Sequence, residues 1–207
     1  MLVPLLVLLL AGDTLRLTPL TSTPTMDGRV GFAPWGTPAL RIAVAGGVAD
    51  LWVGQTDSAV FIAVRIPDGT PSWSDQLIIA LDTEGDRSGT PDHDDFLWAL
   101  DRVLDSSVVY RGKDGRWQPP RGDPDWRLGS DREGGGWSVS SNSDSTGWQV
   151  VIRLDREYFS LANGRGPGLE ARIRDADARS SATWPSWQPL PQPATLDDRP
   201  GMWGVVR

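Results

Sequence analysis

Tryptophan is the most unusual chemical feature of this sequence, with 11 residues in 207 against 4 Phe and 2 Tyr. An indole ring can stack on the apolar face of a sugar while neighbouring polar groups bind the hydroxyls. Such a platform needs rings on loops. Five tryptophans lie in segments bordered by Pro, Gly, Ser or Asp, and these are the candidate ligand-binding residues: Trp73, Trp117, Trp126, Trp184 and Trp187. Any single ring could instead pin its loop to the core, so ligand binding is predicted for the set.

An acidic segment is the second candidate site. It begins Asp82-Thr83-Glu84-Gly85-Asp86 and continues to a second group of Asp residues. Calcium takes roughly six to eight oxygen ligands, which such a loop can supply. Two interpretations remain open: a structural calcium loop that would hold the chain beside Trp73, and a solvated turn whose Asp side chains cap backbone N–H groups. The candidate ligands are Asp82, Glu84, Asp86, Asp92, Asp94 and Asp95.

The calcium segment does not follow the complete EF-hand pattern. Arg87 stands where that pattern requires Gly, and His93 stands where it requires Glu. If calcium binds, its expected role is therefore structural, in a loop between strands.

Catalytic chemistry has little support in the sequence. There is no Cys, and the single His, His93, lies among acidic residues without a G-x-S-x-G motif elsewhere. Carboxylate pairs do not indicate a glycosidase here, because 27 acidic residues would supply such pairs by chance. Haem ligation would need His93 with Met26 or Met202, yet His93 lies in a polar segment. The sequence predicts a binding protein without an organic cofactor.

The net charge limits the class of partner, and the N-terminal segment indicates the cellular compartment. The net charge of −7 argues against nucleic acid as the main partner. The apolar run LVPLLVLLLA over Leu2–Ala11 has the length of a signal-peptide core, although no basic residue precedes it. We expect residues 1–12 to direct export to the periplasm or exterior. No other segment has transmembrane length, and residues 13–207 are expected to form one domain.

Alternating apolar residues predict an all-β protein. The expected strands are 48–54, 58–66, 76–81, 96–103, 107–111, 136–140, 147–154, 169–175 and Met202–Val206. Residues 13–38 are expected to be irregular, and Asp155–Leu161 to form one helical turn. Short strands separated by turn residues indicate an antiparallel, jelly-roll-like β-sandwich with long loops and little helix.

The alternation also assigns faces to the strands. Trp148, Ile152 and Leu154 are expected to point inward, while Glu170 and Arg172 point outward. Trp52, Trp98 and Trp137 also fall in strand patterns, so they are expected in the core or on the sheet surface.

The order of these motifs resembles the family-nine carbohydrate-binding modules and the wider DOMON-like sandwich group. The matching segments are Thr25–Gly28 followed by Trp35, then 49–68, 73–82, 147–158, 168–177, Trp184 and Met202–Gly204. The resemblance implies a jelly-roll sandwich, export, structural calcium and binding of sugar chain ends between aromatic rings.

The ligand contacts implied by the resemblance are only partly present. Trp73 occupies the position of one clamping ring, whereas the region of the second ring, 195–198, has none and Trp187 could substitute. Ile78 and Leu97 stand where the family has a carboxylate and an Arg. We therefore expect a secreted, non-catalytic glycan-binding module. The alternative is a cell-envelope interaction or assembly module of the same fold without sugar binding.

Overall fold

The computed structural model describes residues 14–15, 17–31, 33–44, 46–73, 75–118, 136–156, 167–174 and 204–206. The expected signal segment 1–12 and Trp126, Trp184, Trp187, Met202 and Trp203 lie outside these residues. Within the described part, no helix combines the length and hydropathy needed to cross a membrane.

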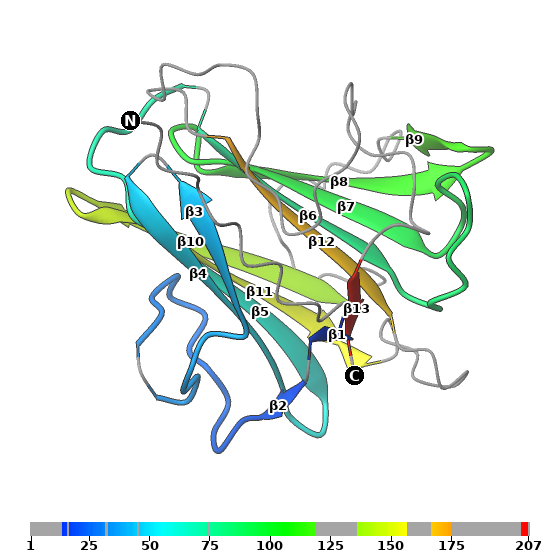
Figure 1. Ribbon diagram of the computed structural model, residues 1–207, viewed down its shortest axis with the longest axis horizontal. Helices are drawn as coiled ribbons and strands as arrows, with labels where there is room; N and C mark the ends of the chain where they lie inside the picture. The colour runs from blue at the N-terminus through cyan, green and yellow to red at the C-terminus, as the bar shows by residue number, and fades with distance from the viewer. Residues whose placement is uncertain are drawn as a thin grey trace, which may run out of the picture.

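Two sheets face each other, as Figure 1 shows. The seven-stranded sheet has the order β1 (Thr14–Leu15), β13 (Gly204–Val206), β12 (Gly168–Arg174), β6 (Gln76–Asp82), β7 (Asp95–Asp101), β8 (Ser106–Lys113) and β9 (Arg116–Gln118). The six-stranded sheet has the order β10 (Trp137–Asp144), β11 (Gly147–Asp155), β5 (Ala59–Ile66), β4 (Gly47–Gln55) and β2 (Thr18–Pro19), with β3 (Leu40–Val44) also paired to β4. Only β1–β13 and β2–β4 pair in parallel. The predicted all-β sandwich is confirmed.

Strand positions agree closely with the alternation, and the differences fall in short elements. β3 and β9 were not expected, and the two-residue strands β1 and β2 lie in a stretch expected to be irregular. The expected helical turn at 155–161 is described only as far as Arg156. These strands are short edge elements whose pairing comes from the neighbouring strand, so their own pattern is weak.

The core lies between the sheets. Leu51, Ile62 and Ile152 are fully buried there and come from three neighbouring strands of one sheet. Leu77 and Ile79 face them from β6. Each such side chain contributes about 1.5–3 kcal/mol by leaving water. Trp98, Trp137 and Trp148 also belong to this cluster, which confirms their predicted structural role.

A second cluster covers the outer face of the six-stranded sheet. Trp35 packs edge-to-face on Phe61 with ring centroids 6.4 Å apart. The Nε1 of Trp52 donates to the carbonyl of Gly36 at 3.1 Å, and Val30 completes the cover. Trp35 and Trp52 therefore hold the N-terminal segment on the sheet and are not free for a ligand.

The outer face of the seven-stranded sheet is also buried. Ile78, Ala80 and Leu97 form a small apolar cluster on it. Glu170 and Arg172 lie on this face, as predicted, but they are only 2% and 6% exposed. Their side chains point outward from the sandwich but do not contact water. The alternation of residues assigns side chains to two faces of a strand and does not determine which face is solvated.

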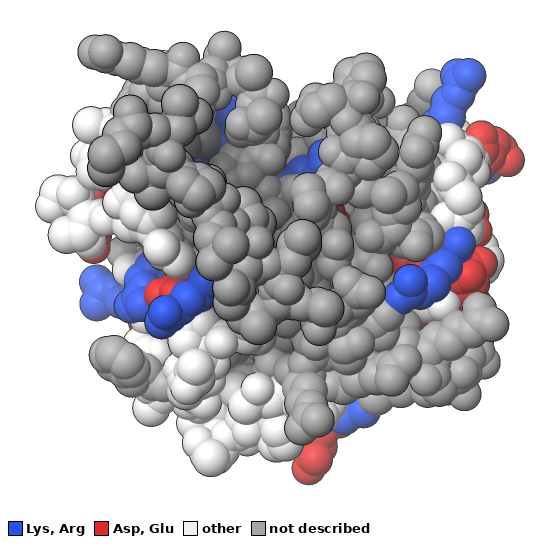
Figure 2. Space-filling model, viewed as in Figure 1, with Lys and Arg blue, Asp and Glu red and all other residues white. Residues whose placement is uncertain are grey.

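The connections between strands lie at two opposite ends of the sandwich, the platform end and the acidic end. The connections β3–β4, β5–β6, β7–β8 and β10–β11 lie at the platform end, and β4–β5, β6–β7 and β8–β9 lie at the acidic end (Figure 1). On the face drawn in Figure 2, basic side chains lie beside acidic ones. Asp50, which pairs with Arg41 at 3.2 Å and Arg65 at 2.8 Å, is typical of this mixing.

Candidate functional site

Trp73 is presented to solvent at the platform end. Its side chain is 73% exposed, the highest value among the exposed large hydrophobics of the described residues. It lies in the connection between β5 and β6, where Asp75 turns the chain by accepting from the N–H of Ser72 at 2.7 Å. An exposed indole on a fixed turn is the geometry that stacking on a sugar requires.

Buried Arg102 fixes the loop that carries Trp73. Its guanidinium pairs with Asp68 and, at 3.5 Å, with Asp75 on either side of Trp73. It also donates to Ser143 Oγ at 2.9 Å, near the end of β10. The β5–β6 connection, the β7–β8 connection and the end of β10 therefore meet at one side chain that is 1% exposed. The loop is held before any ligand arrives, which lowers the entropic cost of binding.

Further apolar side chains surround this end. The other large hydrophobics that are exposed in the described part are Val48, Val103 and Leu104, at 50%, 37% and 58%. All three lie in or beside connections of the platform end.

The structure separates the two candidate tryptophans that it describes. Trp117 lies on β9, where it pairs with Gly112, and is packed against the outer cluster of the seven-stranded sheet at the acidic end. Trp73 and Trp117 cannot clamp one sugar together. Ile78 and Leu97 lie buried in the same outer cluster, so neither offers a polar contact. On this face Glu170 and Arg172 of β12 supply the charged groups, with Oε1 and Nε 3.6 Å apart.

The acidic loop between β6 and β7 is organised around the carboxylates of Asp82 and Asp94. Asp82 accepts from the N–H groups of Gly85 at 2.6 Å and Arg87 at 3.0 Å. Asp94 accepts from Glu84 N–H at 3.0 Å. These bonds agree with the capping interpretation. They leave three groups whose ligand atoms lie within 4.8 Å of one another: Glu84–His93–Asp94, Asp82–Asp86–Asp94 and Asp92–Asp94–Asp95.

Two buried oxygens of this loop accept no hydrogen bond. Oδ1 of Asp94 and Oδ1 of Asp95 are buried and have no hydrogen-bond donor. Burial raises the pKa of Asp95 to about 8, and the neighbouring charge of Asp82 adds to the effect. Burial also raises the pKa of Asp82 itself. Buried, unpaired acceptors are costly, so a hard cation that prefers oxygen ligands fits this loop.

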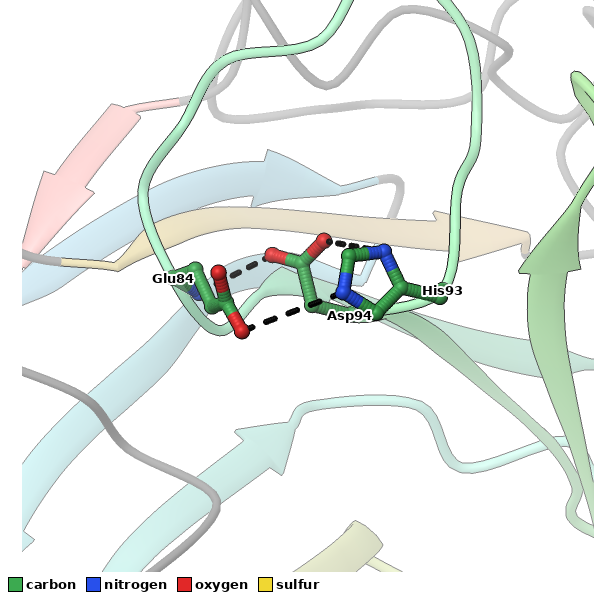
Figure 3. Close-up of side chains that lie close together, drawn as sticks. All are labelled: Glu84, His93 and Asp94. Atoms are coloured by element: carbon green, nitrogen blue, oxygen red, sulfur yellow. Dashed lines mark hydrogen bonds and ion pairs between the residues drawn. The ribbon is translucent and has the colours of Figure 1, made fainter.

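His93 does not form a catalytic or haem-binding arrangement. It is 73% exposed, and its ring nitrogens lie 3.6 Å from Asp94 and 3.9 Å from Glu84, which is beyond hydrogen-bond distance (Figure 3). Met26 lies beside Asp101 at the platform end, while His93 precedes Asp95 at the other end of β7. One haem iron therefore cannot be bound by His93 and Met26.

The expectation that the acidic loop lies beside Trp73 is wrong. Asp82 ends β6, and Trp73 comes before Gln76, where β6 begins. A strand of seven residues spans about 20 Å, so the two features lie at opposite ends of the sandwich (Figure 1). Any cation in the loop would stabilise the acidic end and would not support the ring of Trp73.

Replacing Gly112 with Ala is expected to displace the acidic loop. An added Cβ would lie 2.2 Å from the carbonyl oxygen and 2.5 Å from the nitrogen of Asp92, both backbone atoms. We expect a loss of about 1–3 kcal/mol in thermal unfolding, as for other overpacked sites. Gly89→Ala in the same loop meets no atom within 4 Å and should leave stability unchanged. Equal effects of the two variants would contradict this packing.

Two facing sheets with long connections make the chain a β-sandwich. Neither a protein-family model nor a curated protein sequence matches the chain. Among solved structures it is similar to a family-nine carbohydrate-binding module of Caldicellulosiruptor kristjanssonii in complex with cellotriose. The TM-score is 0.59 at 17% identity, over 94% of this chain and 92% of that chain. It is also similar to a family-nine module from the same organism in complex with glucose, with a TM-score of 0.61 at 16% identity over 94% of both chains.

The fold is therefore that of the family-nine carbohydrate-binding modules, as the sequence motifs indicated.

Proposed function

We propose that this protein is a non-catalytic glycan-binding module that uses Trp73 as its stacking platform. The observation that carries the proposal is the 73% exposure of Trp73 on a loop held by a buried guanidinium. The fold supports it, since the similar solved modules contain cellotriose and glucose. Trp184, Trp187 and Trp126 remain proposed contributors to the same surface.

Trp73→Ala is expected to weaken cellotriose binding by at least about thirtyfold, because truncating a central aromatic contact typically costs 2 kcal/mol or more. Isothermal titration calorimetry with cellotriose measures the loss directly. Trp73→Phe is the matched control: it keeps an apolar ring and should retain most of the affinity. If wild type binds cellotriose and Trp73→Ala binds it equally well, the platform is elsewhere. If wild type binds neither cellotriose nor other polysaccharides, the glycan proposal fails.

The acidic loop belongs to the proposal as a structural calcium site. Asp82, Asp94 and Asp95 would supply the buried oxygens, with Asp86 and Asp92 at the rim. Calcium bound there would offset the repulsion between these carboxylates and hold the loop at the acidic end. Export, inferred from residues 1–12, would place the module where extracellular glycans and calcium are present.

An envelope assembly module is the second candidate, and the exposed apolar side chains of the platform end favour it. Val48, Trp73 and Leu104 could contact a protein surface in place of a sugar. Under this candidate, Leu104→Ser would alter association in size-exclusion chromatography, while no polysaccharide would bind. Under the glycan proposal, Leu104→Ser leaves the molecular mass in solution unchanged.

A further inference from the structure

The only histidine of the chain lies against two acidic side chains at the rim of the acidic loop. Glu84, His93 and Asp94 each offer one ligand atom, and these atoms all lie within 4.8 Å of one another. Figure 3 shows the Asp94 carboxylate between the Glu84 carboxylate and the His93 ring. The three side chains come from opposite limbs of the loop, 83–86 and 92–95, so folding is what brings them together.

The separations between these atoms are close to those around one small divalent ion. Nδ1 of His93 lies 3.6 Å from Oδ1 of Asp94, and Nε2 lies 3.9 Å from Oε1 of Glu84. Zinc bonds of about 2.0–2.2 Å in a tetrahedral arrangement place two ligand atoms roughly 3.4 Å apart. The side chains of Glu84 and His93 are 52% and 73% exposed. Small rotations therefore bring one ring nitrogen and both carboxylates to one ion without disturbing the core.

The buried oxygen of Asp94 is an independent sign of a cation. The Asp94 side chain is 5% exposed. Its Oδ2 accepts from Glu84 N–H at 3.0 Å, but its Oδ1 accepts no hydrogen bond. A buried carboxylate oxygen without a donor is costly. Nδ1 of His93 faces this oxygen from a distance that is too long for a hydrogen bond and suits two ligands of one metal.

Backbone contacts hold the group in place before an ion binds. Thr83 donates to the carbonyl oxygen of Asp94 from its N–H at 3.1 Å and from its Oγ1 at 2.8 Å. This pair of bonds joins the limb that carries Glu84 to the limb that carries His93. Nε of Arg111, on β8, donates to the carbonyl oxygen of His93 at 2.6 Å. The backbone of the site is thus preorganised, which lowers the cost of binding.

The imidazole decides the class of ion. Calcium takes oxygen ligands, whereas zinc and the other late divalent transition metals bind imidazole nitrogen together with carboxylate oxygen. The other two groups of the loop, Asp82–Asp86–Asp94 and Asp92–Asp94–Asp95, offer oxygen alone and are the ones that suit calcium. The group that contains His93 suits a transition metal.

We propose that Glu84, His93 and Asp94 form a transition-metal site of the zinc type, separate from the calcium position of the same loop. The ion would bind Oδ1 of Asp94, one ring nitrogen of His93 and the Glu84 carboxylate, with water as the fourth ligand. It would tie the two limbs of the loop together at the end of the sandwich opposite Trp73. The site does not depend on glycan binding. It shares Asp94 with the calcium proposal, so its test is run in excess calcium.

The single histidine makes the site directly observable. In protein without an affinity tag, the imidazole nitrogen signals of an NMR spectrum all belong to His93. We expect one equivalent of zinc, added in excess calcium, to shift one of these signals, and calcium alone to cause no comparable shift. Absence of zinc binding, or zinc binding that leaves both ring-nitrogen signals in place, would overturn the proposal.

His93→Gln and Glu84→Gln test the ligands one at a time. Both side chains are more than half exposed, so the fold should be unaffected. We expect each variant to bind zinc at least about tenfold more weakly in isothermal titration calorimetry, since changes even behind metal ligands typically cost that much. Asp57→Asn, which removes an exposed acid of the same end, should leave the zinc affinity unchanged.

Zinc affinity equal to that of wild type in His93→Gln would show that the imidazole is not a ligand. Loss of calcium binding alone cannot give that result, because the titration follows zinc in excess calcium. Cellotriose binding should be the same in wild type, His93→Gln and Glu84→Gln, because Trp73 lies at the other end of β6. Failure of the metal site and failure of the glycan proposal are therefore distinguishable.

Discussion

Replacing Arg102 with Met lowers the free energy of unfolding by about 3–5 kcal/mol, the expected cost of breaking a buried ion pair from one side. For a domain of this length, that loss corresponds to a fall in melting temperature of roughly 10 °C. The reason is that Asp68 and Asp75, which are 8% and 2% exposed, would remain buried carboxyl groups without the guanidinium that pairs with them. Thermal unfolding followed by tryptophan fluorescence measures the change.

Arg41→Met is the matched control for this prediction. Arg41 pairs with Asp50 at 3.2 Å, but its side chain is 69% exposed, so the same substitution should cost less than about 1 kcal/mol. Adding Asp68→Asn to Arg102→Met should recover part of the loss, because it removes one unpaired charge. Similar destabilisation by Arg102→Met and Arg41→Met would show that the platform end does not depend on the buried guanidinium.

A cellotriose-binding measurement separates the role of Arg102 in ordering the Trp73 loop from its role in overall stability. At a temperature where Arg102→Met is still folded, we expect weaker cellotriose binding, because Asp68 and Asp75 then leave the Trp73 loop less ordered. The affinity should lie between those of wild type and Trp73→Ala. Wild-type affinity in Arg102→Met would mean that the loop keeps its shape without the clamp.

Long strands such as β5 could be predicted because they carry their own alternation. Val60, Ile62 and Val64 recur at period two, and this pattern is local to the strand. The pairing of Arg102 with Asp68 could not be predicted, since 34 residues separate them and no local pattern links the two connections. The only sequence signal was an Arg beside Asp101 in the mostly apolar segment 96–103.

For the acidic loop, composition predicted that the carboxylates cluster but not where the loop lies in the fold. Its oxygen-rich sequence predicted that carboxylates such as Asp82, Asp86 and Asp94 would lie together, because they belong to one loop between two paired strands. Its place relative to Trp73 was predicted wrongly, since nine positions along an extended strand are a long distance in space. The cavity lined by Leu100, Val139 and Trp148 was not predicted, because its walls come from both sheets and meet only after folding.

Removing calcium is expected to lower the melting temperature by roughly 5–10 °C. A ligand that binds only the folded state at about one hundred times its dissociation constant contributes about 2.7 kcal/mol. Calorimetric scans with calcium and with a chelator measure this difference. In Asp57→Asn, which removes an exposed acid of the same end, the difference should persist. Identical scans of wild type in calcium and in chelator would remove the proposed ion.

The effect of Asp95→Asn on stability should change sign between buffer with chelator and buffer with calcium. With chelator, the substitution removes a fully buried carboxylate whose Oδ1 has no donor, and an amide in its place should leave the protein equally stable or more stable. With calcium, the same substitution removes a charged ligand and should make the variant less stable than wild type. If the loop is instead a solvated acidic turn, Asp95→Asn should change the stability by the same amount with calcium and with chelator.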